Sequence, residues 1–247
     1  MIGDAMKYIL SVFFLFLLSN NVIADEIKPS PFTALSVKHS DYALVCSNTA
    51  FCEKGVKLWR VGGDFVGLYV TTPELRLTQM RLENGKYRAV HEWDFSKVEQ
   101  RNELGDDDLA FDGAEIFPAL YPVSKTQNAI ALVTKWSSAY SGGGRVEHMA
   151  DFFMLNDDNS YTPVVSDIPF YSKEQIKSCF TKSDYDKKSH CEDESWSILY
   201  IRIMDFGSDY YSWDFITKSY NWPAFVDKSK MTVSQTVEKI KILERVK

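Results

Sequence analysis

The chain lacks any motif that fixes a catalytic chemistry. His91 and Glu92 begin like the zinc motif H-E-x-x-H, but Phe95 stands where the second histidine is needed. There is no G-x-S-x-G sequence, so a nucleophile elbow is missing as well. The cysteines do not show C-x2-C spacing, which argues against a four-cysteine zinc site. We therefore expect no metal or cofactor. Because each catalytic motif tried is incomplete, the sequence favours a protein that is not an enzyme.

Three further absences limit where the chain acts and what it binds. After the N-terminal segment, no apolar run approaches the roughly 20 residues of a membrane-spanning helix. No Asn-x-Ser/Thr sequon occurs in residues 25–247. Lysine and arginine do not cluster, and the formal net charge is −6, which argues against nucleic acid and anionic membrane surfaces as partners. An acidic chain of this kind suits a basic protein partner.

The N-terminus has the three parts of a cleavable signal peptide. Lys7 precedes an apolar run over 8–18, and a polar stretch leads to Val22 and Ala24, the small residues that signal peptidase requires. We expect cleavage after residue 24. A membrane anchor is the alternative, but the run of about a dozen residues is too short to span a bilayer. The sequence thus predicts a signal peptide over 1–24 and a periplasmic or secreted protein over 25–247.

Four cysteines, Cys46, Cys52, Cys179 and Cys191, are present. In an oxidising compartment an even number of cysteines indicates disulfides. Of the three possible pairings we favour Cys46–Cys52 and Cys179–Cys191, because each pair is close in sequence and flanked by polar turn residues. Each bond would close a short loop.

Residues 25–247 show a dense series of strand signals. The chain has thirteen tyrosines, sixteen phenylalanines and six tryptophans, which favour strands. Asn84-Gly85 and Gly62-Gly63-Asp64 are hairpin signals. The expected strands are 42–46, 56–61, 65–70, 75–82, 87–93, 129–136, 146–155, 161–165, 196–206 and 210–218. The fold class is mainly β (α+β), with antiparallel sheets packed as a sandwich or open barrel.

Two helices complete this predicted fold. Ser172 and Gln175 form a capping box, which predicts one short internal helix starting at residue 172. The spacing of Val233, Val237 and Ile240 predicts an amphipathic C-terminal helix over 232–246, although residues 240–243 also fit a strand. Residues 25–247 form either one disulfide-bonded domain or two subdomains joined near 95–117, where the chain is rich in charge.

The charged connection is the first candidate site. Asp106, Asp107, Asp108, Asp112 and Glu115 lie within ten residues, but their spacing does not match an EF-hand loop. An irregular calcium site between 106 and 115 remains an alternative. We favour an acidic surface for a basic partner, formed by the three consecutive aspartates.

A hydrolase site is the second candidate. Gly142, Gly143 and Gly144 could donate N–H groups to an oxyanion, with Ser141 before them and His148 after them. Glycines between two strands are more often turn residues. The other dispersed suspects are His91, Asp112 and Glu115.

The third candidate site is aromatic. Tyr211, Trp213 and Phe215 alternate along one strand and are expected in the core. Tyr210, Tyr220 and Trp222 sit near turns, where exposed aromatic side chains often anchor a protein interface.

Three functional hypotheses follow. We favour an exported, non-catalytic binding protein, for example an inhibitor or an immunity-type protein that neutralises a basic protein partner. The alternatives are an exported hydrolase with dispersed catalytic residues and a structural or assembly subunit of an envelope complex.

Overall fold

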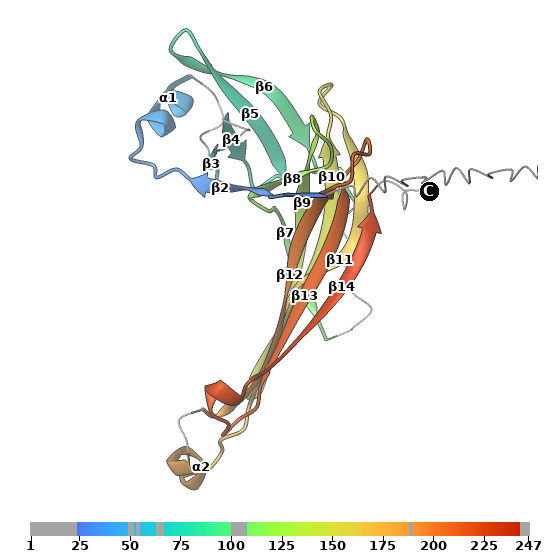
Figure 1. Cartoon of the computed structure of the whole chain (residues 1–247). Coiled ribbons are helices and arrows are strands. Elements are labelled where there is room, and N and C mark those ends of the chain that lie inside the picture. Colours follow the sequence, from blue (N-terminus) through green and yellow to red (C-terminus); the bar gives the residue numbers. More distant parts are fainter. Residues whose placement is uncertain are drawn as a thin grey trace, which may run out of the picture.

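The computed structural model of this chain consists mostly of antiparallel strands, and it describes residues 24–48, 52, 55–62, 67–99, 108–187 and 190–242. Fourteen strands form one connected sheet. Twelve of them follow the order β14-β13-β12-β11-β10-β9-β8-β2-β3-β4-β5-β6, while β1 pairs with β12 and β7 with β9. The helices α1 (Ser40–Asn48) and α2 (Lys182–Lys187) lie at opposite ends of the molecule (Figure 1). The predicted mainly β class is confirmed.

Strands β2 to β6 pair in sequence order as a small antiparallel meander, with α1 between β2 and β3, whereas β1 pairs with β12. The bounds of these N-terminal strands are β1 (Asp25–Ile27), β2 (Ser30–Ala34), β3 (Lys57–Val61), β4 (Gly67–Thr71), β5 (Arg76–Glu83) and β6 (Lys86–Asp94). The β5–β6 turn is the predicted hairpin at Asn84 and Gly85, whose φ angles are 51° and 76°. Both angles lie in the left-handed region that a two-residue hairpin of this kind requires.

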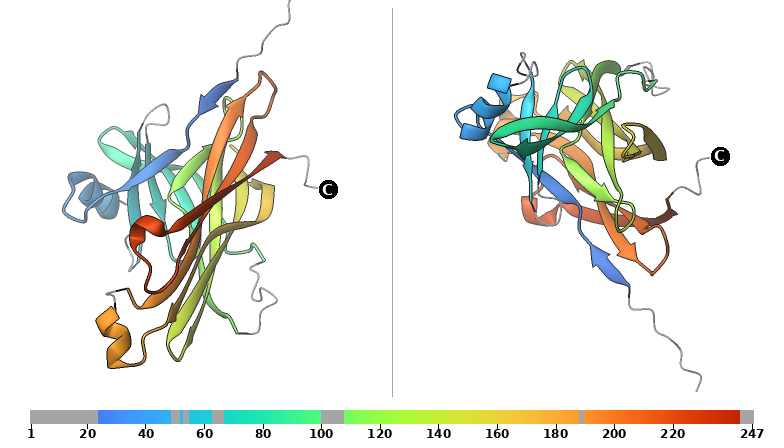
Figure 2. Two further views of the ribbon diagram at one scale, coloured as in Figure 1. Left: turned by 60° about the horizontal axis from the view of Figure 1, so that its bottom comes forward. Right: turned by 90° about the horizontal axis from the view of Figure 1, so that it is seen from above.

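Strands β9 to β14 are longer than β1 to β6, with 10–17 residues each, and they pair in sequence order. The bounds of the remaining strands are β7 (Ala110–Ile116), β8 (Ala119–Pro122), β9 (Asn128–Tyr140), β10 (Gly143–Leu155), β11 (Tyr161–Lys177), β12 (Glu192–Asp205), β13 (Ser212–Trp222) and β14 (Thr232–Lys241), with a 3-10 turn at Lys228–Lys230. Figure 2 shows these long strands crossing the molecule beside the smaller N-terminal part. A hairpin meander keeps neighbours in sequence adjacent in the sheet.

Strand β9 lies between two parts of the core. On one side Ala131 packs in a cluster with Phe152 and Trp213. On the other side Leu132 packs in a cluster with Trp93. Residues 129–134 are all buried as a result. A strand buried on both faces has no reason to alternate, which explains the unbroken apolar run in its sequence.

The internal helix predicted from residue 172 is wrong. Residues 172–177 continue strand β11, and the hydroxyl groups of Ser172 and Ser197 lie 2.7 Å apart across the β11–β12 pair. A helix this short is marginal alone, whereas the strand is paired on both sides by β10 and β12. The helix forms later, at α2, where the backbone N–H and hydroxyl of Thr181 donate to the Asp184 carboxylate.

The C-terminal helix is also wrong, because residues 232–241 form the strand β14. Ile240 lies opposite Trp213 and is buried in the core. Valine, isoleucine and threonine are frequent in this segment, and β-branched side chains favour strands when a pairing partner is present. The last five residues of the predicted helix lie largely outside the described part of the chain.

The first expected strand, 42–46, is a helix in the structure. The backbone N–H of Asp41 donates to Nδ1 of His39 at the start of α1. Tyr42 and Val45, three residues apart, face the small cluster that contains Leu58. Apolar residues three positions apart are typical of a helix. A single pair of this kind is too little to distinguish a helix from a strand by sequence.

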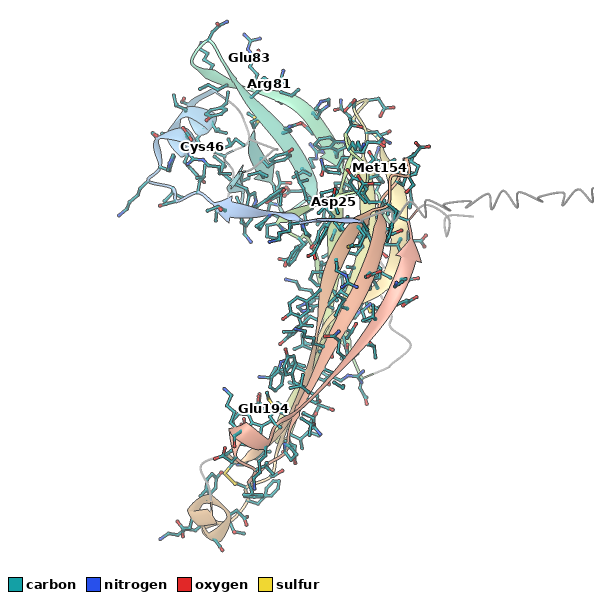
Figure 3. The ribbon with its side chains drawn as sticks, viewed as in Figure 1. Asp25, Cys46, Arg81, Glu83, Met154 and Glu194 are labelled. Atoms are coloured by element: carbon teal, nitrogen blue, oxygen red, sulfur yellow. A yellow bond between two sulfur atoms is a disulfide. The ribbon has the colours of Figure 1, made fainter. Side chains whose placement is uncertain are left out.

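Both disulfides are present in the pairing that the spacing favours, Cys46–Cys52 and Cys179–Cys191. Figure 3 labels Cys46 beside the first bond. In the described part of the chain, no helix has the length and apolar character needed to cross a membrane. Residues 1–23 of the predicted signal peptide lie outside the described residues, and the division into one domain or two stays a prediction.

Candidate functional site

The long strands continue past the core as a projecting arm, which we define as residues 137–147, 171–198 and 216–236. Figure 1 shows this arm running away from the body of the molecule and ending at α2. Among its described residues only Cys179 is buried, and none belongs to the three core clusters. The arm is therefore a single layer of sheet along most of its length, and both of its faces meet solvent.

One face of the arm carries stacked aromatic side chains. Trp196 on β12 lies directly opposite Tyr220 on β13. Their ring centroids are 4.9 Å apart and the planes differ by 7°. Trp222 follows two residues after Tyr220 and so projects from the same face. We call the surface around these three residues the aromatic face.

Trp222 is held in place by three contacts. Its ring stacks on the imidazole of His190 with centroids 3.5 Å apart. Its Nε1 donates to the carbonyl oxygen of Val226 at 2.9 Å. The ammonium group of Lys228 lies 5.6 Å from the ring centroid. A restrained aromatic side chain loses little conformational entropy on binding, which suits it as an interface anchor.

Lysine side chains surround the aromatic face. Lys173 forms an ion pair with Glu194 at 3.4 Å, beside Trp196. Figure 3 labels Glu194 in the lower half of the arm. Lys218 places its Nζ 5.0 Å from the ring centroid of Tyr200. The local charge on this face is thus more positive than the net charge of −6 of the whole chain suggests.

A shallow depression of about 540 Å³ adjoins the aromatic face on β10 and β11. Gly143, Gly144, Lys173 and Gln175 are among the residues that line it. A Cβ atom on Gly143 would meet the carbonyl oxygen of Gln175 at 2.4 Å. The glycine is therefore needed for the close approach of the two strands.

The tip of the arm is a small loop closed by the disulfide Cys179–Cys191. Phe180 is 75% exposed there. Its backbone N–H donates to Oδ2 of Asp184, the residue that also caps α2 through Thr181. An exposed phenylalanine on a restrained loop is a second apolar contact point near the aromatic face.

The six binding residues predicted from the sequence do not form one site. Tyr220 and Trp222 lie together on the aromatic face. Tyr210 is exposed at the β12–β13 turn, at the other end of β13, roughly 35 Å away along the strand. Asp108 is exposed just before β7, and Asp106 and Asp107 lie outside the described residues.

The glycine run is not an oxyanion hole. Gly143 and Gly144 belong to β10 and are paired with β9 and β11 on its two sides. Ser141 lies in the turn, and His148 lies five residues beyond Gly143, roughly 17 Å along the strand. This geometry does not bring the serine and the histidine together.

Part of the dispersed hydrolase set does converge. Lys135 lies opposite His148 and forms an ion pair with Glu115 at 2.7 Å. Burial lowers the pKa of His148, and the positive charge of Lys135 adds to this effect, whereas Glu115 and Asp112 oppose it. His91 lies elsewhere, on β6, with its Nδ1 3.3 Å from the side-chain oxygen of Asn159. Within the described ranges no group of three metal-ligating side chains is arranged to hold an ion.

Sequence reasoning missed Trp196 as a member of the site, although a signal for it existed. The turn at Gly207-Ser208-Asp209 is centred on residue 208, and a regular hairpin around that centre places residue 196 opposite residue 220. Counting the register outward from the turn would have paired the two aromatic residues. The same counting does not place Lys173 beside Trp196. The connection from β11 to β12 contains α2 and the disulfide loop, so it is not a short turn from which a register can be counted.

The described residues of the arm offer groups that suit binding. They are aromatic rings, lysine ammonium groups and a shallow depression. Compared with known protein families, curated proteins and solved structures, the chain matches none.

Proposed function

We propose that this chain is an exported, non-catalytic binding protein that holds a protein partner on the aromatic face of its arm. The observation that supports this proposal is the stacked pair Trp196–Tyr220 with Trp222 beside it, on a sheet face that no core cluster covers. Aromatic residues on a surface of this kind are the usual anchors of protein interfaces.

The charges around the face indicate the chemistry of the partner. Lys173, Lys218 and Lys228 lie next to the aromatic rings, and only Lys173 has a carboxylate partner among the ion pairs given above. An ammonium group beside an aromatic ring attracts a carboxylate on a partner. The contacting surface of the partner is therefore apolar with acidic groups at its margin. The basic partner suggested by the net charge would instead contact the acidic segment near Asp108.

Export to the periplasm or the cell exterior is part of this proposal. Two disulfides suit an oxidising compartment, and Cys179–Cys191 closes the tip of the proposed binding arm. Inhibition or neutralisation of the partner is the role we propose for the complex. A subunit of an envelope assembly would use the same surface. The two roles differ in one respect: an inhibitor abolishes the activity of its partner, whereas an assembly subunit does not.

The test is capture of a partner by the full chain, purified after export and immobilised. We expect one envelope or secreted protein to be retained in a stoichiometric amount. Trp196→Ala and Trp222→Ala each should weaken its binding by about tenfold to hundredfold, since each removes an aromatic anchor. Binding is measured by calorimetry with the purified partner.

Tyr210→Ala is the matched control, because Tyr210 is an exposed aromatic residue at the opposite end of β13. Its binding should equal that of the unchanged chain. If Tyr210→Ala weakens binding as much as Trp222→Ala does, or if neither arm variant has an effect, the aromatic face is not the binding surface.

A further inference from the structure

Strand β14 is the last strand of the sheet, and β13 is its one pairing partner among the described strands. It pairs with β13 from Asn221↔Thr232 to Ser212↔Lys241 without a register shift. No described strand pairs with its outer edge. Residues 232–239 are all exposed, which means that neither face of this segment is covered. Figure 2 shows β14 crossing the front of the molecule as an outer strand.

The two edges of the sheet differ in how they are protected. At the other edge, β6 carries charges at Lys86, Arg88, Glu92 and Asp94, and its pairing with β5 has an irregularity next to Met80. Charges and bulges are the usual devices against edge-to-edge pairing. The segment 232–237 has no charged residue, no proline and no irregularity in its pairing. It is a regular strand with an edge open to a further strand.

The sequence of β14 is complementary to itself in the antiparallel sense. If two copies pair with Gln235 opposite Gln235, Val233 of each copy lies opposite Val237 of the other. These valines are 55% and 47% exposed in the single chain. Because residues 233, 235 and 237 share one face, both valine pairs form on the same side of the joined sheet.

This register also joins apolar rows that already cross the arm. Tyr220 lies opposite Val233, and Trp196 lies opposite Tyr220. Ile216 lies opposite Val237, and Tyr200 lies opposite Ile216. With Gln235 at the centre, the row ending at Val233 in one copy meets the row ending at Val237 in the other. Two continuous rows of six apolar side chains then cross the interface, one on each side of the two-fold axis.

The charges of the strand fit the same arrangement. Glu238 and Lys239 lie toward the C-terminal end of β14. In the antiparallel pair they come opposite Thr232 and Met231 of the second copy, which carry no charge. No like charges face each other, so electrostatic repulsion does not oppose the pairing.

We propose that this protein self-associates as a two-fold dimer in which β14 pairs with β14 of a second copy, centred on Gln235. Each copy contributes the same surface, as an isologous interface requires. The two aromatic faces become one continuous surface on the joined sheet. This inference does not depend on the proposed partner, because it concerns the outer edge of β14 and two copies of the same chain.

The experiment measures the dimer dissociation constant of the full chain by sedimentation velocity, from about 1 μM to about 1 mM protein. Val233→Lys and Val237→Glu should each raise this constant by at least about tenfold, because each places a charge opposite a valine at two sites. The double variant Val233→Lys/Val237→Glu should recover most of the affinity. In it the introduced lysine of each copy faces the introduced glutamate of the other.

Leu82→Lys is the control, since Leu82 is an exposed aliphatic residue on β5 with 54% exposure. It should leave the dissociation constant unchanged. As a second measurement, Gln235→Cys should form an intermolecular disulfide on mild oxidation, whereas Leu82→Cys should not. Far-ultraviolet circular dichroism shows whether each variant is folded. A chain that is monomeric up to about 1 mM, or a dimer that the single valine variants leave intact, would overturn the proposal.

Discussion

Arg202 and Asp214 form an ion pair across β12 and β13, with Nη2 of the arginine 2.5 Å from Oδ2 of the aspartate. The Nε atom of Arg202 donates to the same oxygen at 3.1 Å. The aspartate side chain is 7% exposed and the arginine side chain 43% exposed. A buried carboxylate is thus stabilised by a partner that reaches the surface.

Removing the arginine should therefore cost more stability than removing an exposed ion pair. We expect Arg202→Met to lower the free energy of unfolding by about 2–3 kcal/mol, because it leaves a buried charge without its donor. Urea denaturation measures the change. The double variant Arg202→Met/Asp214→Leu should be more stable than Arg202→Met alone. For comparison, Arg60→Met breaks the more exposed Arg60–Asp41 pair and should cost less than about 1 kcal/mol; equal losses at the two sites would contradict this reasoning.

Gly143 should not tolerate a side chain. We expect Gly143→Ala to destabilise the protein by about 1–3 kcal/mol, because its Cβ would meet the Gln175 carbonyl oxygen at 2.4 Å and the Tyr140 ring at 2.5 Å. Thermal unfolding followed by circular dichroism gives the change in midpoint. Gly62→Ala is the matched control, since a Cβ there has no atom within 4 Å. The idea of a close strand approach fails if both substitutions have the same effect.

The stability of the chain should fall in mild acid, in part because of His148. Its pKa in the folded state is lowered from 6.5, first by burial and then by the charge of Lys135. Between that lowered pKa and 6.5, the unfolded chain binds more protons than the folded one, so stability decreases as the pH falls through this window. We expect His148→Gln to reduce the loss of stability between pH 7.5 and pH 5.5, measured as the urea midpoint at each pH. An identical decline in His148→Gln would show that His148 does not contribute.

The local parts of the fold could be predicted from the sequence, and the long-range parts could not. The Asn84-Gly85 hairpin follows from two residues that accept positive φ. Tyr211, Trp213 and Phe215 are buried as their alternation indicates, with exposures of 6%, 0% and 4%. By contrast, the capping box at Ser172 is a genuine local signal for a helix. It is overridden because β12, which returns after the disulfide loop, offers hydrogen bonds along the whole segment.

The candidate site shows the same division. The sequence predicts Tyr220 and Trp222 as exposed aromatic residues near a turn, and in the structure both lie on the aromatic face but are half-buried. Tyr210 was grouped with them although a whole strand separates it from Trp222. That β11 continues past the core could not be predicted either, because the capping box at Ser172 favours a helix over these residues.

The same strands build the core and the arm, so no linker separates the two. From Ile203 in the core to Glu192 near the tip, β12 runs without interruption for roughly 35 Å. A molecule bound at the tip is therefore held at a set distance and orientation from the rest of the protein. In the proposed function the arm would serve as a spacer, and its length would determine how far from the body of the protein a bound molecule is presented.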